Sequence, residues 1–403
     1  MAKCVLALIN ELNEIAVGID LCRKSTQITF YNRKNTEPKT VAAGSENSKY
    51  QIETPKELFS LVEEETERGT ELLAEFFGSC FERLSGAGAP DCLYVMVTMK
   101  KMRPVWASAV TEALKRRNVL EENIYLQDHR ESFFNYVMNQ RKDLWNYHVA
   151  LFEYETDRIT AWELAVDTRT KPAFVRVEEK SHVFVDEKAR SGMDEEQWKK
   201  EKDRRFLSQI QELFKGKVFS SAYLIGNGFD KEWARESLRF LCTRRHVFMG
   251  DNLYTKGACY GAMARCGMAG SGDYLYAGPD MIEYNMGMEM LVRGNREYYS
   301  MITAGVNWYS ARHVCEFILD DTKDIVFLSR HLDGSQMSHT VTLTELPKRP
   351  NRATRIHLEM EFISKNRCRV RMEDLGLGSL YPSSGKQWEA VIDLGRERKE
   401  SEA

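Results

Sequence analysis

The turn that follows Asp20 carries residue types that can hold a phosphate chain and its metal ion. Backbone N–H groups of Leu21 to Ser25 can point at phosphates, and the Asp20 carboxylate can hold a hydrated Mg²⁺ ion. Arg23 and Lys24 in the same turn can pair with phosphates directly. Apolar runs flank the turn on both sides, so taken alone it favours an ordinary surface hairpin.

A second segment, Gly226-Asn227-Gly228-Phe229-Asp230, lies between a predicted strand and a predicted helix. Glycine lets the backbone approach a ligand closely, and the first N–H groups of a helix are unpaired. A dinucleotide-binding fingerprint needs a third glycine where Lys231 stands, so dinucleotide binding is disfavoured. A plain strand-to-helix turn explains the segment equally well.

The run from Tyr254 to Ala262 is rich in small residues, with Gly257 and Gly261 one helical turn apart. Small residues at that spacing let a second helix cross closely. We expect such a crossing to serve either as a hinge between two lobes or simply as a packed pair of helices.

The fourth segment, residues 149–164, reads as an apolar strand, a polar turn and a second strand. It mirrors the hairpin that the sequence predicts for residues 15–31. Two equivalent hairpins that face each other from opposite lobes would form a duplicated phosphate clamp. The prediction therefore depends on the loop after Ile19 meeting the loop that begins near Tyr154.

The elements that position these segments alternate between strand and helix as far as about residue 285. Residues 92–97 predict a buried strand, and residues 194–214 predict a charged amphipathic helix. After residue 285 helical periodicity almost disappears, and short strands are predicted. These strands are 325–328, 341–343, 356–362, 367–372 and 391–394.

We therefore predict an α/β protein with a two-lobed core and a C-terminal β-rich module. Lobe I spans residues 1–145 with the first hairpin, and lobe II spans residues 146–285 with the glycine segment. The β-rich module spans residues 286–403. A chain of 403 residues is too long for a single ordinary core, which fits this division.

Charge and composition exclude several classes of partner. Lys and Arg total 57 against 60 Asp and Glu, so the whole molecule has no electrostatic reason to bind nucleic acid or anionic membranes. The run Cys4 to Ile9 is too short to span a membrane, and Glu11 follows it where a signal peptide needs small residues. We expect that run to lie in the core and the charged tail, residues 396–403, to be frayed.

The nine cysteines include no C-x-x-C pair, which suits a reducing cytoplasm. His246, Cys259 and Cys266 come nearest to a metal cluster, but their spacing matches no standard zinc pattern. We expect a cytoplasmic protein with buried free cysteines and no structural metal.

The order of these segments resembles the actin, sugar-kinase and heat-shock chaperone superfamily, most of all chaperones of the DnaK type, over roughly residues 15–265. Gly18-Ile19-Asp20-Leu21 resembles the first phosphate motif, and Leu224 to Gly228 resembles the adenosine motif. The other similar segments are Gln127–Tyr136 and Lys256–Ala262, which resemble the two connecting segments, and Ile356–Asp374, which is similar to part of the chaperone's substrate-binding β-sandwich.

The resemblance implies a duplicated, ribonuclease H-like and actin-like ATPase core that binds ATP and Mg²⁺. It implies that Asp20 holds Mg²⁺ through water and that Glu153 is the acid of the second lobe. It also implies a protein or peptide partner for the C-terminal β-rich module. The nucleotide-binding residues it implies are Cys22, Arg23, Lys24, Ser25, Gly226, Asn227, Gly228, Phe229 and Asp230.

Several positions depart from the family pattern. The second phosphate motif of the family reads D-L-G-G-G-T, where this chain has Glu153-Tyr154-Glu155-Thr156-Asp157-Arg158. Extra carboxylates repel a triphosphate, and the side chains fill space that glycine would leave. Phe133 and Phe134 replace small residues of the first connecting helix, which argues against the usual hinge. The insertion of lobe II, between the second hairpin and Gly226, is short and looks reduced.

Two functions stay open on the sequence. The first is an ATP-binding, chaperone-like conformational switch with weak or no hydrolysis. The second is a pseudo-ATPase scaffold that binds a protein or peptide without nucleotide chemistry. A sugar kinase is less favoured, because no polar cluster suited to a sugar can be identified, and the sequence predicts no oligomeric state.

Overall fold

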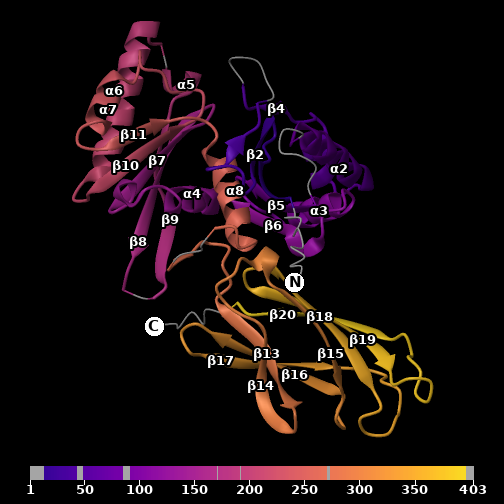
Figure 1. Ribbon diagram of the computed structural model, residues 1–403. Helices are drawn as coiled ribbons and strands as arrows, with labels where there is room; N and C mark the ends of the chain where they lie inside the picture. Colours follow the sequence, from indigo (N-terminus) through magenta and orange to yellow (C-terminus); the bar gives the residue numbers. More distant parts are fainter. Residues whose placement is uncertain are drawn as a thin grey trace, which may run out of the picture. The chain divides into compact units, whose positions relative to one another are not determined.

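The computed structural model describes residues 13–42, 49–84, 91–169, 171–190, 192–269 and 273–395 (Figure 1). The expected core run Cys4–Ile9 and the expected frayed tail at residues 396–403 lie outside the described residues. The chain divides into two compact units, Met1–Gly278 and Pro279–Ala403. Among the described helices, none has the length and apolar character needed to cross a membrane.

Lobe I is built on a six-stranded sheet of order β3-β2-β1-β5-β6, with β4 also paired to β2. β1 and β2 form an antiparallel hairpin, and β1, β5 and β6 run parallel. Because parallel strands end at one edge, Asp20 and Asp128 are brought to the same edge of the sheet. The strands are β1 (Glu14–Asp20), β2 (Ser25–Tyr31), β3 (Lys39–Thr40), β4 (Ile52–Glu53), β5 (Cys92–Met99) and β6 (Ile124–Asp128).

Helices pack against the strands of lobe I and against one another. Thr66 caps α2 by accepting a hydrogen bond from the backbone N–H of Gly69 at 3.0 Å, and Pro104 begins α3. α8 packs directly on β1 and β5 and crosses α4. The helices are α1 (Leu58–Glu63), α2 (Glu67–Glu82), α3 (Pro104–Lys115), α4 (His129–Met138) and α8 (Leu253–Arg265).

Lobe II repeats the strand pattern of lobe I in a sheet of order β11-β10-β7-β8-β9-β12. β7 and β8 form an antiparallel hairpin, and β10 and β11 follow parallel to β7, as β5 and β6 follow β1. The duplicated core is therefore present. The strands are β7 (His148–Tyr154), β8 (Arg158–Asp167), β9 (Ala173–Phe184), β10 (Phe219–Ile225), β11 (His246–Met249) and β12 (Tyr274–Tyr276).

The charged helix predicted for residues 194–214 is α6 (Glu195–Phe214). Asp194 and Gln197 form a reciprocal capping box at its start. Its apolar stripe buries Phe206 against Phe152 in the core of lobe II. Two short helices, α5 (Glu187–Arg190) and α7 (Arg235–Leu241), accompany it.

The second unit is a β-sandwich of two antiparallel four-stranded sheets, β14-β13-β16-β17 and β15-β18-β19-β20. Buried and exposed residues alternate along β18 and β19, and their inward side chains form the core. The predicted module, residues 286–403, falls within this unit. The strands are β13 (Tyr284–Val292), β14 (Asn295–Ile302), β15 (Arg312–Ile318), β16 (Asp324–His331), β17 (Gln336–Thr342), β18 (Arg355–Ser364), β19 (Arg367–Gly376) and β20 (Gln387–Asp393).

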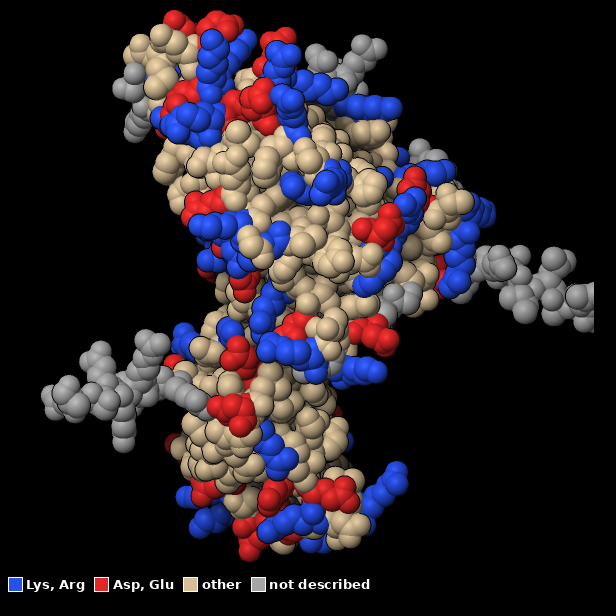
Figure 2. Space-filling view, turned by 90° about the vertical axis from the view of Figure 1, so that its left-hand side faces the viewer, with Lys and Arg blue, Asp and Glu red and all other residues tan. Residues whose placement is uncertain are grey.

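The predicted fold class is confirmed: an α/β core whose two lobes repeat one strand pattern is followed by a β-rich module. Figure 2 shows basic and acidic side chains interspersed on the visible face, without an extended patch of one sign. That distribution agrees with the near-neutral charge balance of the sequence.

Candidate functional site

Asp20 ends β1 and is buried at the edge of the lobe I sheet. Its Oδ1 atom lies 2.9 Å from Nε2 of His129 and 3.4 Å from Sγ of Cys22. His129 is the first residue of α4, directly after Asp128, whose carboxylate caps that helix. The end of β6 therefore delivers a histidine to the carboxylate that the sequence predicts as a magnesium ligand.

Glu153 approaches the same point from lobe II, near the end of β7. The hydroxyl of Tyr254, on α8, hydrogen-bonds to the Glu153 carboxylate. The Tyr254 ring stacks on His129 with 3.9 Å between ring centroids. Asp20, His129, Tyr254 and Glu153 thus form one continuous set of contacts, which we call the buried acid cluster. The ends of β1 and β7 are thus linked through His129 and Tyr254, whereas the expected crevice between the two loops stays a prediction.

Burial and charge act in opposite directions on the buried acid cluster. Burial lowers the pKa of His129, but the Asp20 carboxylate and the nearby Glu153 outweigh burial and leave that pKa raised. Burial raises the pKa of Glu153 and raises the pKa of Tyr254 well above its usual range. His129 is therefore the group whose protonation can compensate the Asp20 carboxylate inside the protein.

A second ion pair joins the lobes at the tip of the second hairpin. Lys100, just after β5, pairs with Glu155, just after β7, and Arg158 Nε donates to Glu155 at 3.0 Å. Burial raises the pKa of Glu155, but its hydrogen bonds to Lys100 and Arg158 prevail and lower it. This carboxylate, which the sequence predicts to repel phosphate, is thus neutralised within the protein.

The glycine segment of lobe II is covered by a tyrosine. Gly226 has a φ of +98°, and a Cβ atom there would lie 2.2 Å from the carbonyl oxygen of Tyr154. A Cβ atom on Gly228 would lie 2.2 Å from the Tyr154 ring. Trp233 Nε1 also donates to the carbonyl oxygen of Gly228 at 2.9 Å. The lack of side chains at both glycines therefore allows Tyr154 to pack closely. The space that these glycines leave is filled by Tyr154.

Three more predicted site residues belong to the first turn. Arg23 is exposed, pairs with Glu63 at 3.2 Å and lies over the ring of Phe59. Lys24 is exposed, and Ser25 begins β2. None of these three contacts the buried acid cluster through an interaction among the described residues.

The remaining predicted residues belong to the glycine segment. Asn227 is exposed, and Phe229 is buried in the core of lobe II against Phe206. Asp230 accepts a hydrogen bond from the backbone N–H of Glu232 at 2.8 Å, inside its own loop.

The helix crossing predicted from small residues is present. A Cβ atom on Gly257 of α8 would lie 1.9 Å from the carbonyl oxygen of Ser132 on α4. Phe133, the next residue, is fully buried in the core of lobe II, edge-on to Tyr223. Ser132 faces the crossing, and Phe133 and Phe134 pack in the core of lobe II instead, so the expectation that they disfavour the usual hinge stays a prediction.

His129, Tyr254 and Lys100 are the site residues that the sequence reasoning missed. His129 directly follows a predicted strand, at the same sheet edge where the strand of Asp20 ends. That position in the sequence was the one signal that could have identified it. Tyr254 opens the small-residue helix, but its hydroxyl partner lies about a hundred residues earlier in the chain.

The residues at this position do not fit the Mg²⁺–ATP that the fold implies. Asp20 is paired with His129, Glu153 with Tyr254, and Glu155 with Lys100. A triphosphate would have to displace these partners and lie beside uncompensated carboxylates. The glycine segment, which would receive the nucleoside, packs against Tyr154.

Comparison with solved structures shows similarity of fold alone. A Bacteroides thetaiotaomicron protein with an actin-like ATPase fold and unknown function is 11% identical, with a TM-score of 0.32, covering 63% of this chain and 98% of that chain. Inorganic polyphosphate/ATP-glucomannokinase from Arthrobacter sp. strain KM is 13% identical, with a TM-score of 0.37, covering 62% and 99%. A Ppx/GppA family member from Aquifex aeolicus is 9% identical, with a TM-score of 0.28, covering 62% and 89%.

No curated protein matches the chain. Residues 281–394 match a domain of unknown function, DUF8552. Residues 37–279, more than half of the chain, match the family described as "Family of unknown function (DUF5716) C-terminal". With its two lobes of repeated strand pattern, the chain belongs to this DUF5716 C-terminal family.

Proposed function

We propose that this protein is a pseudo-ATPase scaffold whose C-terminal β-sandwich binds an acidic protein segment. The pseudo-ATPase part of this proposal is carried by the buried acid cluster. In that cluster the carboxylates of Asp20 and Glu153 are already bonded to side chains of the protein itself. The actin-like core then acts as a fixed frame, without nucleotide chemistry. Eight cysteines among the described residues are free, which supports a location in the reducing cytoplasm.

Opening the Asp20–His129 pair is costly because both of its members are buried. Removing one partner of a buried pair costs about 3–5 kcal/mol. Since about 1.4 kcal/mol is a factor of ten, opening the pair would weaken nucleotide binding by about a hundredfold to a few thousandfold. The carboxylates of Glu153 and Glu155 add repulsion to that cost.

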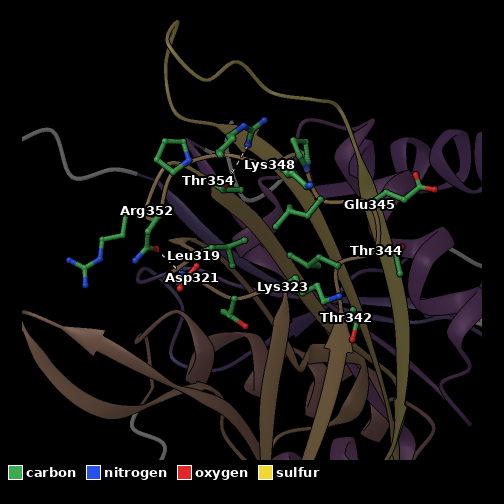
Figure 3. A pocket seen from close by; sticks show the side chains of 16 residues that line it. Leu319, Asp321, Lys323, Thr342, Thr344, Glu345, Lys348, Arg352 and Thr354 are labelled. Atoms are coloured by element: carbon green, nitrogen blue, oxygen red, sulfur yellow. Dashed lines mark hydrogen bonds between the residues drawn. The ribbon is translucent and has the colours of Figure 1, made fainter.

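The partner site that we propose is a pocket of about 550 Å³ in the second unit (Figure 3). Lys323 lies near its middle, while Arg352 and Glu345 extend outward on opposite sides. The lining is largely polar and includes Thr342, Thr344 and Thr354. Pockets with converging polar groups are the usual form of a specific binding site.

Charge selects an acidic occupant for this pocket. Arg349 is held by buried Asp374 at 2.7 Å, and Arg352 is held by Asp320 at 2.9 Å. Lys323 and Lys348 are exposed and form no ion pair with a described residue. Their two ammonium groups therefore remain free to attract carboxylates. The lining also contains the carboxylates of Asp321 and Glu345, but Glu345 is already paired with Lys386 at 2.6 Å.

The backbone around this pocket is specially shaped. Asp321, Glu345 and Arg352 have φ values of +50°, +54° and +64°, which non-glycine residues rarely adopt. Such conformations persist only where the surrounding structure enforces them, and they concentrate at binding sites. The Arg349–Asp374 pair supplies part of that support, because hydrogen bonds to Arg349 and Ser384 hold the pKa of Asp374 well below its usual range.

Binding of an acidic segment to the pocket is tested with full-length protein and a fluorescent peptide rich in Asp and Glu. We expect saturable binding that Lys348→Glu weakens at least about tenfold, since a charge reversal costs more than about 1.4 kcal/mol. Arg296→Glu, an exposed charge reversal outside the pocket, is the matched control and should leave binding unchanged. Equal loss in both variants would show a non-specific charge effect and reject the pocket.

The nucleotide half is tested by thermal unfolding with Mg²⁺–ATP. A ligand that binds only the native state must raise the unfolding temperature, and we expect no rise at millimolar nucleotide. A saturable rise that Asp20→Ala abolishes would instead favour the second candidate, a DnaK-type nucleotide switch. That candidate is favoured by one observation: α4 and α8 cross through Gly257 between the two lobes, where a hinge would lie.

A further inference from the structure

We propose that Asp20, Cys22 and His129 form a binding site for a zinc-type transition-metal ion. The three ligand atoms would be Asp20 Oδ1, Cys22 Sγ and His129 Nε2, with a fourth position open to water. The inference goes beyond the scaffold function, although it involves the same Asp20–His129 pair, because the ion would lie between these two side chains in place of their direct contact.

The spacing of the three donor atoms suits a tetrahedral ion. They all lie within 4.8 Å of one another, with Oδ1 3.4 Å from Sγ and 2.9 Å from Nε2. Zinc bonds of about 2.0–2.3 Å place tetrahedral ligand atoms about 3.3–3.6 Å apart. The Asp20–His129 distance therefore has to open by only about half an ångström, within ordinary side-chain rotation.

The framework around the donors is already fixed. The backbone N–H of Leu21 donates to Thr98 at 2.9 Å, and Thr54 Oγ1 donates to the Cys22 carbonyl at 2.8 Å. The imidazole of His129 is held in orientation by its stack on Tyr254. A site whose ligands are held by their surroundings loses little entropy when the ion binds.

Donor chemistry and charge select the kind of ion. Nitrogen and sulfur donors favour zinc and its neighbours over Mg²⁺, which prefers oxygen ligands in octahedral geometry. The two positive charges of the ion would balance the Asp20 carboxylate and the Cys22 thiolate. Asp20 and His129 are buried, and Cys22 is partly exposed.

The test uses full-length protein stripped by a chelator and then titrated with Co²⁺ and Zn²⁺ without nucleotide. We expect one Co²⁺ per chain, with thiolate-to-metal absorption that excess Zn²⁺ abolishes. Cys22→Ser should lose this absorption and weaken zinc binding at least about a hundredfold, more than the loss of a residue that does not touch the ion would cause. Cys266→Ser, a partly exposed cysteine of the same unit, is the control and should bind as the native protein does.

A second variant guards against misfolding of the first. His129→Asn should also lose tight cobalt binding, and circular dichroism verifies that each variant is folded. Cobalt absorption without a thiolate contribution, or equal binding by Cys22→Ser and native protein, would overturn the site. Because this assay contains no ATP, its failure leaves the nucleotide test of the scaffold proposal unaffected.

Discussion

The two hairpins share a backbone pattern but present different side chains to the point where they meet. The lobe I hairpin, β1 and β2, ends in Asp20 and keeps potential ligands around it, Cys22 and His129. The lobe II hairpin, β7 and β8, carries Glu153 and then Tyr154, which packs on the glycine segment. A duplicated fold can thus keep its backbone geometry while one half gathers metal-ligand side chains and the other half packs a tyrosine on its glycines.

The largest expected effect comes from removing the partner of the lobe I acid. His129→Ala leaves buried Asp20 without compensation and should lower the free energy of unfolding by about 3–5 kcal/mol. Urea unfolding measures the change. Exposed His246→Ala is the matched control, expected within about 0.5 kcal/mol of the native protein. Adding Asp20→Asn to His129→Ala should recover part of the loss, and strict additivity would contradict a direct pair.

Packing of the lobe I hairpin against α8 gives the next effect. A Cβ atom on Gly18 would lie 2.3 Å from the backbone nitrogen of Cys259, so Gly18→Ala should destabilise the protein by about 1–3 kcal/mol or more. Gly250→Ala, where nothing lies within 4 Å of the added atom, is the control in the same unfolding assay. Similar stabilities for both variants would show that α8 moves away from β1 at little cost.

The lobe II acid should be less sensitive than the lobe I acid. Tyr254→Phe removes the hydroxyl bonded to Glu153 while keeping the ring that stacks on His129. Glu153 is partly buried, so the lost hydrogen bond should cost about 1–2 kcal/mol, and protonation limits the loss because burial already raises the pKa of Glu153. Urea unfolding that shows a larger loss than His129→Ala would reverse the proposed ranking of the two lobes.

The pH dependence of stability distinguishes the histidine from the carboxylates. The folded pKa of His129 is raised above its ordinary 6.5, so its stabilisation is complete below pH 6.5 and is lost as pH rises through the folded value. The pKa of Glu153 is also raised in the folded protein, so its contribution to stability likewise decreases as the pH rises above 4.5. Urea midpoints at successive pH values should therefore fall above pH 6.5, and His129→Asn should remove that fall.

Glu155 titrates in a separate, more acidic window. Its folded pKa is lowered below 4.5, so its contribution is present above pH 4.5 and is lost as pH falls through the folded value.

A native protein whose stability stays constant from pH 6.5 upward would contradict the charged Asp20–His129 pair.

The smallest expected effect comes from the interlobe pair of Lys100 and Glu155. The Lys100 side chain is 53% exposed, so solvent screens the pair and Lys100→Ala should cost less than about 1 kcal/mol. Urea unfolding at low and high salt measures this contribution. A loss comparable to that of His129→Ala would place the main contact between the lobes at the hairpin tip.

Much of the core was predictable because local patterns were consistent with the fold. The continuous apolar run of β1 and the capping residues of α6 are signals that survive without tertiary information. Strands β13, β14 and β15 were not predicted. Most residues of β14 are exposed, so the alternation that marks a half-buried strand is weak there.

The candidate site was only half predictable. Asp20 and Glu153 could be found because Asp20 ends β1 and Glu153 is the last residue but one of β7, and the ends of both hairpin strands are visible in the sequence. Their partners could not, because His129 lies 109 residues from Asp20 and only the sheet order brings the two together. Phe229 was expected beside a nucleoside but lies in the core of lobe II, since strand-to-helix turns do not reveal which way their apolar residue faces.

The most direct measurement is an NMR titration of the imidazole of His129, assigned by the signal missing in His129→Asn. The buried acid cluster predicts a pKa above the ordinary value and signals that millimolar Mg²⁺–ATP leaves in place. A saturable shift of those signals by Mg²⁺–ATP, with release of the Asp20 contact, would contradict a core closed by its own side chains.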